Sequence, residues 1–330
     1  MMKSIENKGI KATNTLKNEV AGKTKPFVKD ISEVMMKDNT RKINKSLYYW
    51  AGRNFGDELN KSLFEKVFGI QFNYCTSCWQ ADYIAIGSLL GFSCSVVGYG
   101  SIKRNLIDIL KGILKGGMKL SKITVLGSGF QNWSDEYKIK YLRKMDFKIV
   151  RGRLSENYLR KNKILKTDVV LGDLGLLAPY MIKNESKKYK LGIVPHYIDL
   201  GSPLVFDIYK KHYPDCIIIN VQDNVEMVIK QISECETIIS SSLHGLIVAD
   251  SYGVPNLWME NTLRYGMQDR YKYHDYYSIY DLDKMEPVNL FELMHKNIED
   301  INKEYKIKIE TVKNKQKELY EYCKGYFNGI

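Results

Sequence analysis

Three consecutive serines followed by leucine, histidine and glycine form the part of this 330-residue sequence with the clearest chemical content. The segment Ile238–Pro255 places these residues between an apolar strand-like stretch and an apolar helix-like stretch. Serine hydroxyls and the first amides of a helix favour an anion, because those N–H groups lack partners and the helix dipole is positive there. His244 would stand at the helix start as an acid/base or as a cationic partner of a phosphate. The alternative is that the serines only cap a helix and His244 is a satisfied polar residue.

The elements that must hold this segment alternate regularly along the chain. Short apolar runs rich in β-branched and aromatic residues recur from residue 46, and most of them end at a glycine turn followed by a helix-like stretch. The predicted strands are 46–50, 82–86, 95–97, 122–126, 147–150 and 168–171, then 190–194, 216–221, 237–239 and 255–259. This alternation predicts an α/β fold with parallel sheets and flanking helices. Two Rossmann-like domains, divided near residue 186, should bind ligands beyond the carboxyl ends of their strands.

Composition and charge bound the remaining interpretations. Apolar residues make up 44% and charged residues 27%, which is a globular composition. The net charge is +12, and residues 1–50 hold 11 Lys and Arg against 5 Asp and Glu. A basic chain suits nucleic acid, anionic lipid or anionic small molecules. No recognised nucleic-acid-binding motif is present, so we expect no nucleic-acid partner. The basic first segment is either a solvated tail or a peripheral contact with a membrane surface.

The sequence also predicts where the protein resides and which groups it does without. It contains no run of about 18 apolar residues and no signal-peptide core at its start, so we expect a cytoplasmic protein, with the inner face of the plasma membrane as the alternative. Its six cysteines form no dense framework, and Cys75 and Cys78 make a lone CxxC pair. We expect buried thiols there, with metal or redox use as the alternative. No metal-ligand cluster is visible.

Eight segments, taken in order, resemble motifs of the polysaccharide pyruvyltransferase family. Ile238–Pro255 is similar to its strand, S-S-x-L-H-G, apolar helix and G-[IV]-P. The other seven segments are Asn54–Asn60, Ile86–Leu90, Leu126–Phe130, Val150–Ser155, Leu171–Leu177, Gly192–Asp199 and Lys272–Tyr277. Each motif alone is weak, but eight in order over residues 46–280 are specific.

The resemblance implies a glycosyltransferase-B-like architecture, with the two domains facing each other across a cleft. The predicted domain organisation is a basic tail at 1–45, an N-terminal domain at 46–186, a C-terminal donor domain at 187–287 and terminal helices at 288–330. The resemblance also implies transfer of the pyruvyl unit of phosphoenolpyruvate onto two hydroxyls of a sugar as a cyclic ketal. The acceptor would be a sugar or lipid-linked oligosaccharide of an exopolysaccharide or capsule precursor, and no cofactor is required. Alternatives are a nucleotide-sugar-dependent glycosyltransferase on the same architecture and a non-catalytic scaffold.

That chemistry assigns tasks to particular side chains. Arg151 is the candidate clamp for the donor's carboxylate or phosphate, with an interdomain ion pair as the alternative. His244 would protonate C3 of the donor or stabilise the departing phosphate. Asp57 is the candidate base for the sugar hydroxyls, unless it only caps a helix. The predicted substrate-binding residues are Asn54, Gly56, Gly129, Arg153, Asp173, His196, Ser241, Ser242, Leu243, Gly245 and Lys272.

Several of these residues also have structural alternatives. Asp173 has a structural role as its alternative, His196 has interdomain packing and Lys272 has a solvated position. One position departs from the family pattern, since many members have Arg where this chain has Ser242. Lys272, Arg153 or Arg270 would supply the missing positive charge, or amides and serine hydroxyls would hold the donor instead.

Overall fold

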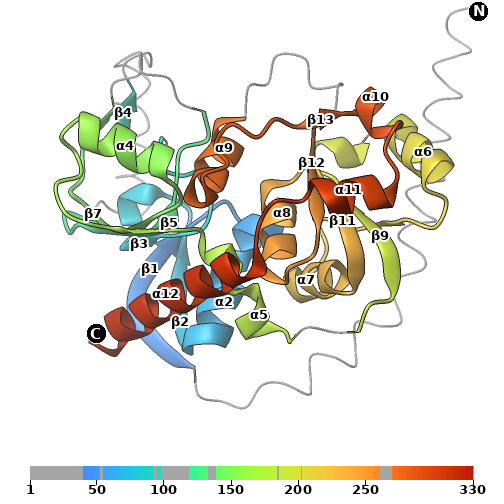
Figure 1. Ribbon diagram of the computed structural model, residues 1–330. Coiled ribbons are helices and arrows are strands. Elements are labelled where there is room, and N and C mark those ends of the chain that lie inside the picture. The colour runs from blue at the N-terminus through green and yellow to red at the C-terminus, as the bar shows by residue number, and fades with distance from the viewer. Residues whose placement is uncertain are drawn as a thin grey trace, which may run out of the picture. The chain divides into compact units, whose positions relative to one another are not determined.

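The computed structural model describes residues 40–52, 55–91, 95–97, 119–132, 139–183, 186–201, 203–260 and 270–329. Residues 41–330 form one compact unit. The described strands make two parallel sheets (Figure 1), together with a short antiparallel pair of β4 (Ser95–Val97) and β6 (Ile139–Tyr141). The α/β class predicted from the alternation is confirmed.

The first sheet has the strand order β2-β1-β3-β5-β7-β8, and each pair of neighbours is parallel. Its strands are β1 (Arg41–Tyr48), β2 (Ile70–Cys75), β3 (Tyr83–Ile84), β5 (Ile123–Ser128), β7 (Met145–Val150) and β8 (Val170–Leu171). The accompanying helices are α2 (Phe55–Phe68), α4 (Arg153–Lys161), α5 (Ala178–Met181) and the short η1 (Cys78–Gln80) and η2 (Leu174–Leu177). All six residues of β5 are buried, as expected for a central parallel strand covered on both faces.

The second sheet has the order β10-β9-β11-β12-β13 and is also parallel throughout. Its strands are β9 (Tyr189–Val194), β10 (Ile217–Ile218), β11 (Cys235–Ser240), β12 (Asn256–Glu260) and β13 (Val288–Asn289). Its helices are η3 (Asp199–Gly201), α6 (Pro203–His212), α7 (Val225–Ser233), α8 (Leu243–Ser251), α9 (Tyr271–Tyr277), η4 (Ser278–Tyr280), α10 (Leu290–Leu293), α11 (Ile298–Glu304) and α12 (Ile309–Asn328).

One apolar core joins the two sheets. It contains Leu47 of β1, Phe64 of α2, Ile238 of β11 and Ile247 of α8. The final helix α12 returns to the first sheet, where Phe327 packs against rings of β2 and β3 (Figure 1). Separate clusters fill the outer face of each sheet. The two sheets share this core. The expectation that two domains face each other across a cleft stays a prediction.

Both sheets reverse their strand order at an equivalent place. In the first sheet β1 is followed by β2 on one side and β3 on the other, and in the second sheet β9 is flanked in the same way by β10 and β11. Such switch points are where open α/β sheets bind ligands, beyond the carboxyl ends of the strands. The strand order therefore predicts ligand binding at the turns after β1, β3, β9 and β11.

The structure places some element boundaries differently from the sequence-based prediction. Strand β1 begins at Arg41, inside the predicted basic tail 1–45, and Ile43 and Leu47 are its buried residues. Most of that tail lies outside the described residues. Strand β13 opens the segment 288–330, where only helices were expected. Strand β10 covers only two residues of the predicted strand 216–221.

Candidate active site

The serine run holds the carboxyl ends of β9 and β11 together. The Ser240 hydroxyl donates to the carbonyl of Val194 at 2.8 Å and accepts from the amide of Ser242 at 3.0 Å. The Ser241 hydroxyl donates to Asp199 at 2.7 Å and accepts from the amide of His196 at 2.9 Å. Ser242 is the N-cap of α8, but its side chain makes no capping bond. Two of the three serine hydroxyls are thus used to build the turn.

Helix α8 starts in close contact with the strands beneath it. A Cβ at Gly245 would lie 2.4 Å from the Ser240 hydroxyl and 2.8 Å from a Val194 methyl, so a side chain there has no room. Leu243 is buried beside this contact, with 5% of its surface exposed. Eight of the nine residues of α8 are buried, and its apolar sequence suits a helix packed on all sides. The helix start therefore holds His244 in a fixed position.

His244 is where the switch points of the two sheets meet. A Cβ built on Gly56, at the start of α2, would lie 2.1 Å from its Nδ1. The Phe55 ring meets the imidazole edge-on at 6.4 Å, and the Phe55 amide donates to the carbonyl of Val221 at 2.7 Å. The turn after β1 in the first sheet thus lies against the turn after β11 in the second. This contact requires glycine at position 56.

Asp173 faces His244 from the first sheet. The His244 Nε2 and the Asp173 Oδ2 lie 3.8 Å apart, and both are buried atoms without a hydrogen-bond partner. The other oxygen, Oδ1, caps η2 by accepting from the amide of Gly175 at 2.8 Å. Two unpartnered polar atoms facing each other at this separation can bind a ligand group or share a proton.

Burial sets the protonation of this pair. Burial, together with the positive charges of Arg151 and Lys272, lowers the pKa of His244 to about 3, so the imidazole is neutral near pH 7. Burial also raises the pKa of Asp173 to about 6, although the Gly175 amide and Arg151 act in the opposite direction. At 3.8 Å an imidazolium would be stabilised by the carboxylate, so an anion that offsets the nearby positive charges would favour a protonated His244.

Arg151 is fully buried and ion-paired. Its Nε donates to Asp275 at 3.0 Å and its Nη1 donates to the Ser88 hydroxyl at 2.8 Å. Its Nη2 donates to the carbonyl of Phe130. A Cβ at Gly129 would lie 2.6 Å from this guanidinium. The geometry therefore favours the ion-pair alternative for Arg151 over a direct clamp on the donor. Its charge still acts on His244 and Asp173.

Asp275 joins the guanidinium to α4 and α9. Its two oxygens also accept from the backbone amide and the hydroxyl of Ser155, at 2.8 and 2.7 Å. The motif-based prediction did not select Asp275, Asp199 or Ser88, although each lies within a segment that carried the resemblance. Aspartates at fixed motif positions were the available signal. Their partners lie too far away in sequence to be identified.

Lys272 enters the site from α9. It is 8% exposed, its ammonium lies 5.3 Å from the centre of the Tyr273 ring, and its charge acts on His244. Tyr273 donates to the carbonyl of Ser241 at 2.7 Å and stacks on Trp258 at 4.3 Å. These contacts fix α9 against the serine run. Of the three cations considered as substitutes for the missing arginine, Lys272 is therefore the one that the structure brings to His244.

The other two cations are engaged elsewhere. Arg153, at the start of α4, pairs with Asp281 at 2.9 Å, and both side chains are exposed. Arg270 bridges Glu260 and Glu286. Both are therefore less well placed than Lys272 for a donor at the start of α8.

Three further predicted residues take different places. Asp57 lies close to the turn that follows β3. Its Oδ1 is 3.6 Å from a Cβ built on Gly87, which has φ +120°. His196 lies at the end of β9, with its amide on the serine run. Asn54 lies outside the described residues. The roles of all these residues stay predictions.

Among the described residues, no group of three or more His, Cys, Asp and Glu side chains could hold a metal ion. Among the same residues, no helix is long and apolar enough to cross a membrane. The thiols of Cys75 and Cys78 are buried and unbridged, as expected.

The fold and the site define an α/β protein in which the carboxyl edges of two parallel sheets meet at one histidine. Residues 25–262 match the family model described as polysaccharide pyruvyl transferase, which is more than half of the 330-residue chain. The chain belongs to the polysaccharide pyruvyl transferase family, a family of transferases. This confirms the family resemblance, and seven of the eight segments lie within the matched residues, whereas Lys272–Tyr277 lies beyond them.

Individual relatives are distant. The chain is 26% identical over 243 residues to the uncharacterized protein L143 of Acanthamoeba polyphaga mimivirus, covering 72% of this chain and 74% of that protein. It is 25% identical over 221 residues to the succinoglycan biosynthesis protein ExoV of Rhizobium meliloti (strain 1021), covering 63% and 57% respectively. A solved structure, the functionally uncharacterized KP1_0663 from Klebsiella pneumoniae subsp. pneumoniae NTUH-K2044, aligns at 15% identity and a TM-score of 0.42, covering 74% of this chain and 92% of that one.

Proposed function

We propose that this protein transfers the pyruvyl group of phosphoenolpyruvate to a sugar of an exopolysaccharide precursor, forming a cyclic ketal. The observation that carries the proposal is the pair of buried, unpartnered atoms, His244 Nε2 and Asp173 Oδ2, at the contact between the two sheets. Membership of the family and the name of the ExoV relative support the class of acceptor. The identity of the donor and of the ketal product is part of what we propose.

The donor's negative charges would occupy the start of α8. The helix start has no side-chain cap, and the positive charge of Lys272 acts on His244 there. A phosphate and a carboxylate bound there would offset the charges of Lys272 and Arg151, which now lower the pKa of His244. Donor binding would therefore raise that pKa and place a proton on His244, with the Asp173 carboxylate stabilising the imidazolium.

The reaction then balances with one histidine. His244 gives its proton to C3 of phosphoenolpyruvate, and C2 becomes electrophilic as the double-bond electrons form the new C–H bond. The first sugar hydroxyl adds to C2 and returns a proton to His244. Phosphate leaves C2 with the bonding electron pair, the second hydroxyl adds, and its proton is taken up by the phosphate. His244 thus acts as acid and then as base, and Asp173 acts as a positioning residue.

The donor can be tested without knowing the acceptor. Millimolar phosphoenolpyruvate should raise the melting temperature of the protein, because a ligand that binds only the folded state stabilises it. UDP-glucose and GDP-mannose at the same concentration should not. Stabilisation by a nucleotide sugar but not by phosphoenolpyruvate would contradict the proposal and favour a glycosyltransferase.

The transfer itself needs a panel of lipid-linked saccharides. Incubation with phosphoenolpyruvate should release phosphate and increase the mass of one saccharide by the mass of pyruvic acid less one water. Phosphate release without a modified saccharide would contradict the proposed transfer. His212→Ala serves as a matched histidine variant, since His212 lies at the end of α6 and should leave the reaction unchanged.

A further inference from the structure

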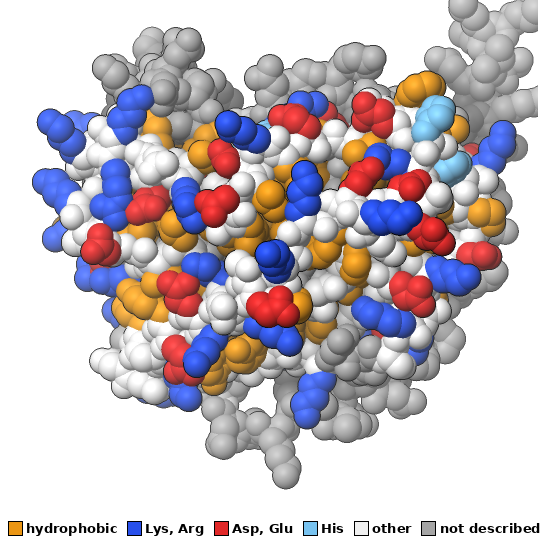
Figure 2. All heavy atoms as spheres, viewed as in Figure 1, with side chains coloured by type: hydrophobic (Ala, Val, Ile, Leu, Met, Phe, Trp, Pro, Cys, Tyr) orange, Lys and Arg blue, Asp and Glu red, His pale blue; other side chains and the backbone are white. Residues whose placement is uncertain are grey.

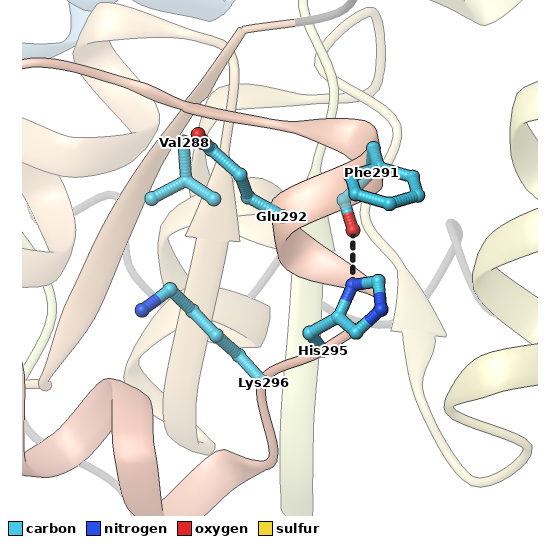
Figure 3. Close-up of a pocket in the computed structure, with 5 residues that line it drawn as sticks. All are labelled: Val288, Phe291, Glu292, His295 and Lys296. Atoms are coloured by element: carbon cyan, nitrogen blue, oxygen red, sulfur yellow. Dashed lines mark hydrogen bonds between the residues drawn. The ribbon is translucent and has the colours of Figure 1, made fainter.

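A surface hollow of about 470 Å³ lies beside the short helix α10. Its lining residues are Val288, Phe291, Glu292, His295 and Lys296 (Figure 3). The volume falls within the roughly 300–1,000 Å³ range of small-molecule sites. None of these residues belongs to the segments that identify the family, so the hollow is a feature of this chain that the proposed reaction does not use.

An exposed aromatic ring dominates the hollow. Phe291 is 72% exposed, and the His295 ring lies beside it with centroids 4.8 Å apart. The His295 Nδ1 is hydrogen-bonded to the carbonyl of Phe291 at 2.9 Å, which fixes the pair of rings. Figure 3 shows the two rings together on one side of α10 and the side chains of Glu292 and Lys296 on the other. The hollow thus combines flat apolar faces with polar groups.

The helix that carries these side chains is anchored firmly. Leu293 is 1% exposed and belongs to the core on the outer face of the second sheet. The hydroxyl of Tyr213, which directly follows α6, lies within hydrogen-bonding distance of the carbonyls of Leu293 and Lys296, at 3.2 and 2.8 Å. Asn289 and Glu292 form a capping box at the helix start. A preorganised surface binds with a smaller loss of entropy than a mobile one.

Carboxylates outnumber ammonium groups among the charged side chains named around the hollow. The ammonium of Lys296 pairs with Glu304 at 2.5 Å, and Glu292 adds a second carboxylate. Figure 2 shows Lys and Arg side chains mixed with Asp and Glu side chains over α10 and α11, rather than a surface of one sign. An anionic membrane would require an excess of positive charge. Rings beside hydrogen-bonding groups of both kinds suit an uncharged polyol, because C–H faces pack on rings while hydroxyls find donors and acceptors.

The hollow also lies on the same edge of the sheet as His244. Helix α10 begins where β13 ends, and β13 is parallel to β12 and, through it, to β11. Two strand spacings place the ends of β13 and β11 about 10 Å apart. Arg270, at the start of α9, bridges Glu260 at the end of β12 and Glu286 before β13. Leu293 of α10 packs on the outer face of this sheet and Leu243 of α8 on the inner face, so a chain of linked sugars that passes around this edge could reach both the hollow and His244.

We infer that the hollow beside α10 binds a sugar unit of the acceptor saccharide other than the one that is pyruvylated, with Phe291 as the ring on which that unit packs. This inference rests on the proposed function for the identity of the bound saccharide. It makes the protein select an oligosaccharide rather than a single sugar.

The test measures saccharide binding by the full chain in the absence of phosphoenolpyruvate, on an array of microbial oligosaccharides. The wild-type protein should bind at least one class, and Phe291→Ala should bind it about threefold to tenfold more weakly, the range expected for losing one ring contact. Phe291→Tyr keeps the ring and should retain binding. Tyr180→Ala, which removes an exposed ring on α5, is the matched control and should bind normally.

Three outcomes would overturn the inference. They are no saccharide bound by the wild type, equal binding by Phe291→Ala, or sedimentation with phosphatidylglycerol vesicles that depends on Phe291. The substitution of a largely exposed residue should leave the melting temperature nearly unchanged, so misfolding can be recognised. Failure here leaves the phosphoenolpyruvate tests untouched, and saccharide binding would persist if the donor assignment failed. The two proposals can therefore fail separately.

Discussion

Replacing Gly56 with alanine would place a methyl group against the imidazole of His244. The new Cβ would lie 2.1 Å from Nδ1, whereas ordinary contact begins near 3.4 Å, so the ring must retreat by about 1.3 Å. Displacement of a catalytic group by about 1 Å can cost roughly 10²-fold in rate. Gly56→Ala should therefore lower the turnover rate by about 10²-fold.

Stability should change much less than the rate. Alanine in a helix is favoured over glycine by about 1 kcal/mol, and overpacking costs about 1–3 kcal/mol, so the net loss of unfolding free energy should be about 2 kcal/mol at most. The assay pairs acceptor-dependent phosphate release with urea unfolding. Gly325→Ala is the matched control, because a Cβ at this position of α12 meets nothing within 4 Å. It should keep full activity and unfold at slightly higher urea.

Equal turnover in the Gly56→Ala variant and the wild type would refute the reasoning, provided that both proteins are folded. It would mean that His244 tolerates a displaced ring and does not act on the reacting atoms.

Three further predictions concern stability. Asp275→Asn should lower the unfolding free energy by about 3–5 kcal/mol, because it leaves the buried Arg151 charge unpaired, and an unchanged urea midpoint would contradict this. The pKa of His244 is lower in the folded protein, so its contribution to stability is lost as the pH falls from about 6.5 toward 3; His244→Gln should lose less stability than wild type on acidification. The pKa of Asp173 is raised to about 6, so its contribution is lost as the pH rises from about 4 through 6; Asp173→Asn should lose less stability over that range, and parallel pH curves would contradict both assignments.

The sequence was most informative where periodicity and turn chemistry act locally. The predicted strand 122–126 shares residues 123–126 with β5. The strand-to-helix passage at the serine run was also predicted, with His244 in the first turn of α8. In these segments an apolar run ends at glycine or serine, and that signal does not depend on the rest of the chain.

Long-range pairing was what the sequence could not provide. Arg151 was assigned to the donor because its charge suits an anion, but Asp275, 124 residues away, already holds it. Nothing local indicates that a carboxylate so far along the chain will reach this guanidinium. The same limit applies to Gly56, whose need for glycine comes from an imidazole on the other sheet. Strand β1 was predicted to begin at residue 46, whereas it begins at Arg41, because Ile43 stands among basic and polar residues that are not typical of a strand.

The most direct test of the central claim is the rate of acceptor-dependent phosphate release from phosphoenolpyruvate by His244→Gln, compared with wild type and His212→Gln. Loss of a general acid/base typically costs about 10²–10⁴-fold, so His244→Gln should fall by that factor while His212→Gln stays at the wild-type rate. A His244→Gln protein that is folded and turns over at the wild-type rate would contradict the claim that His244 carries the reaction.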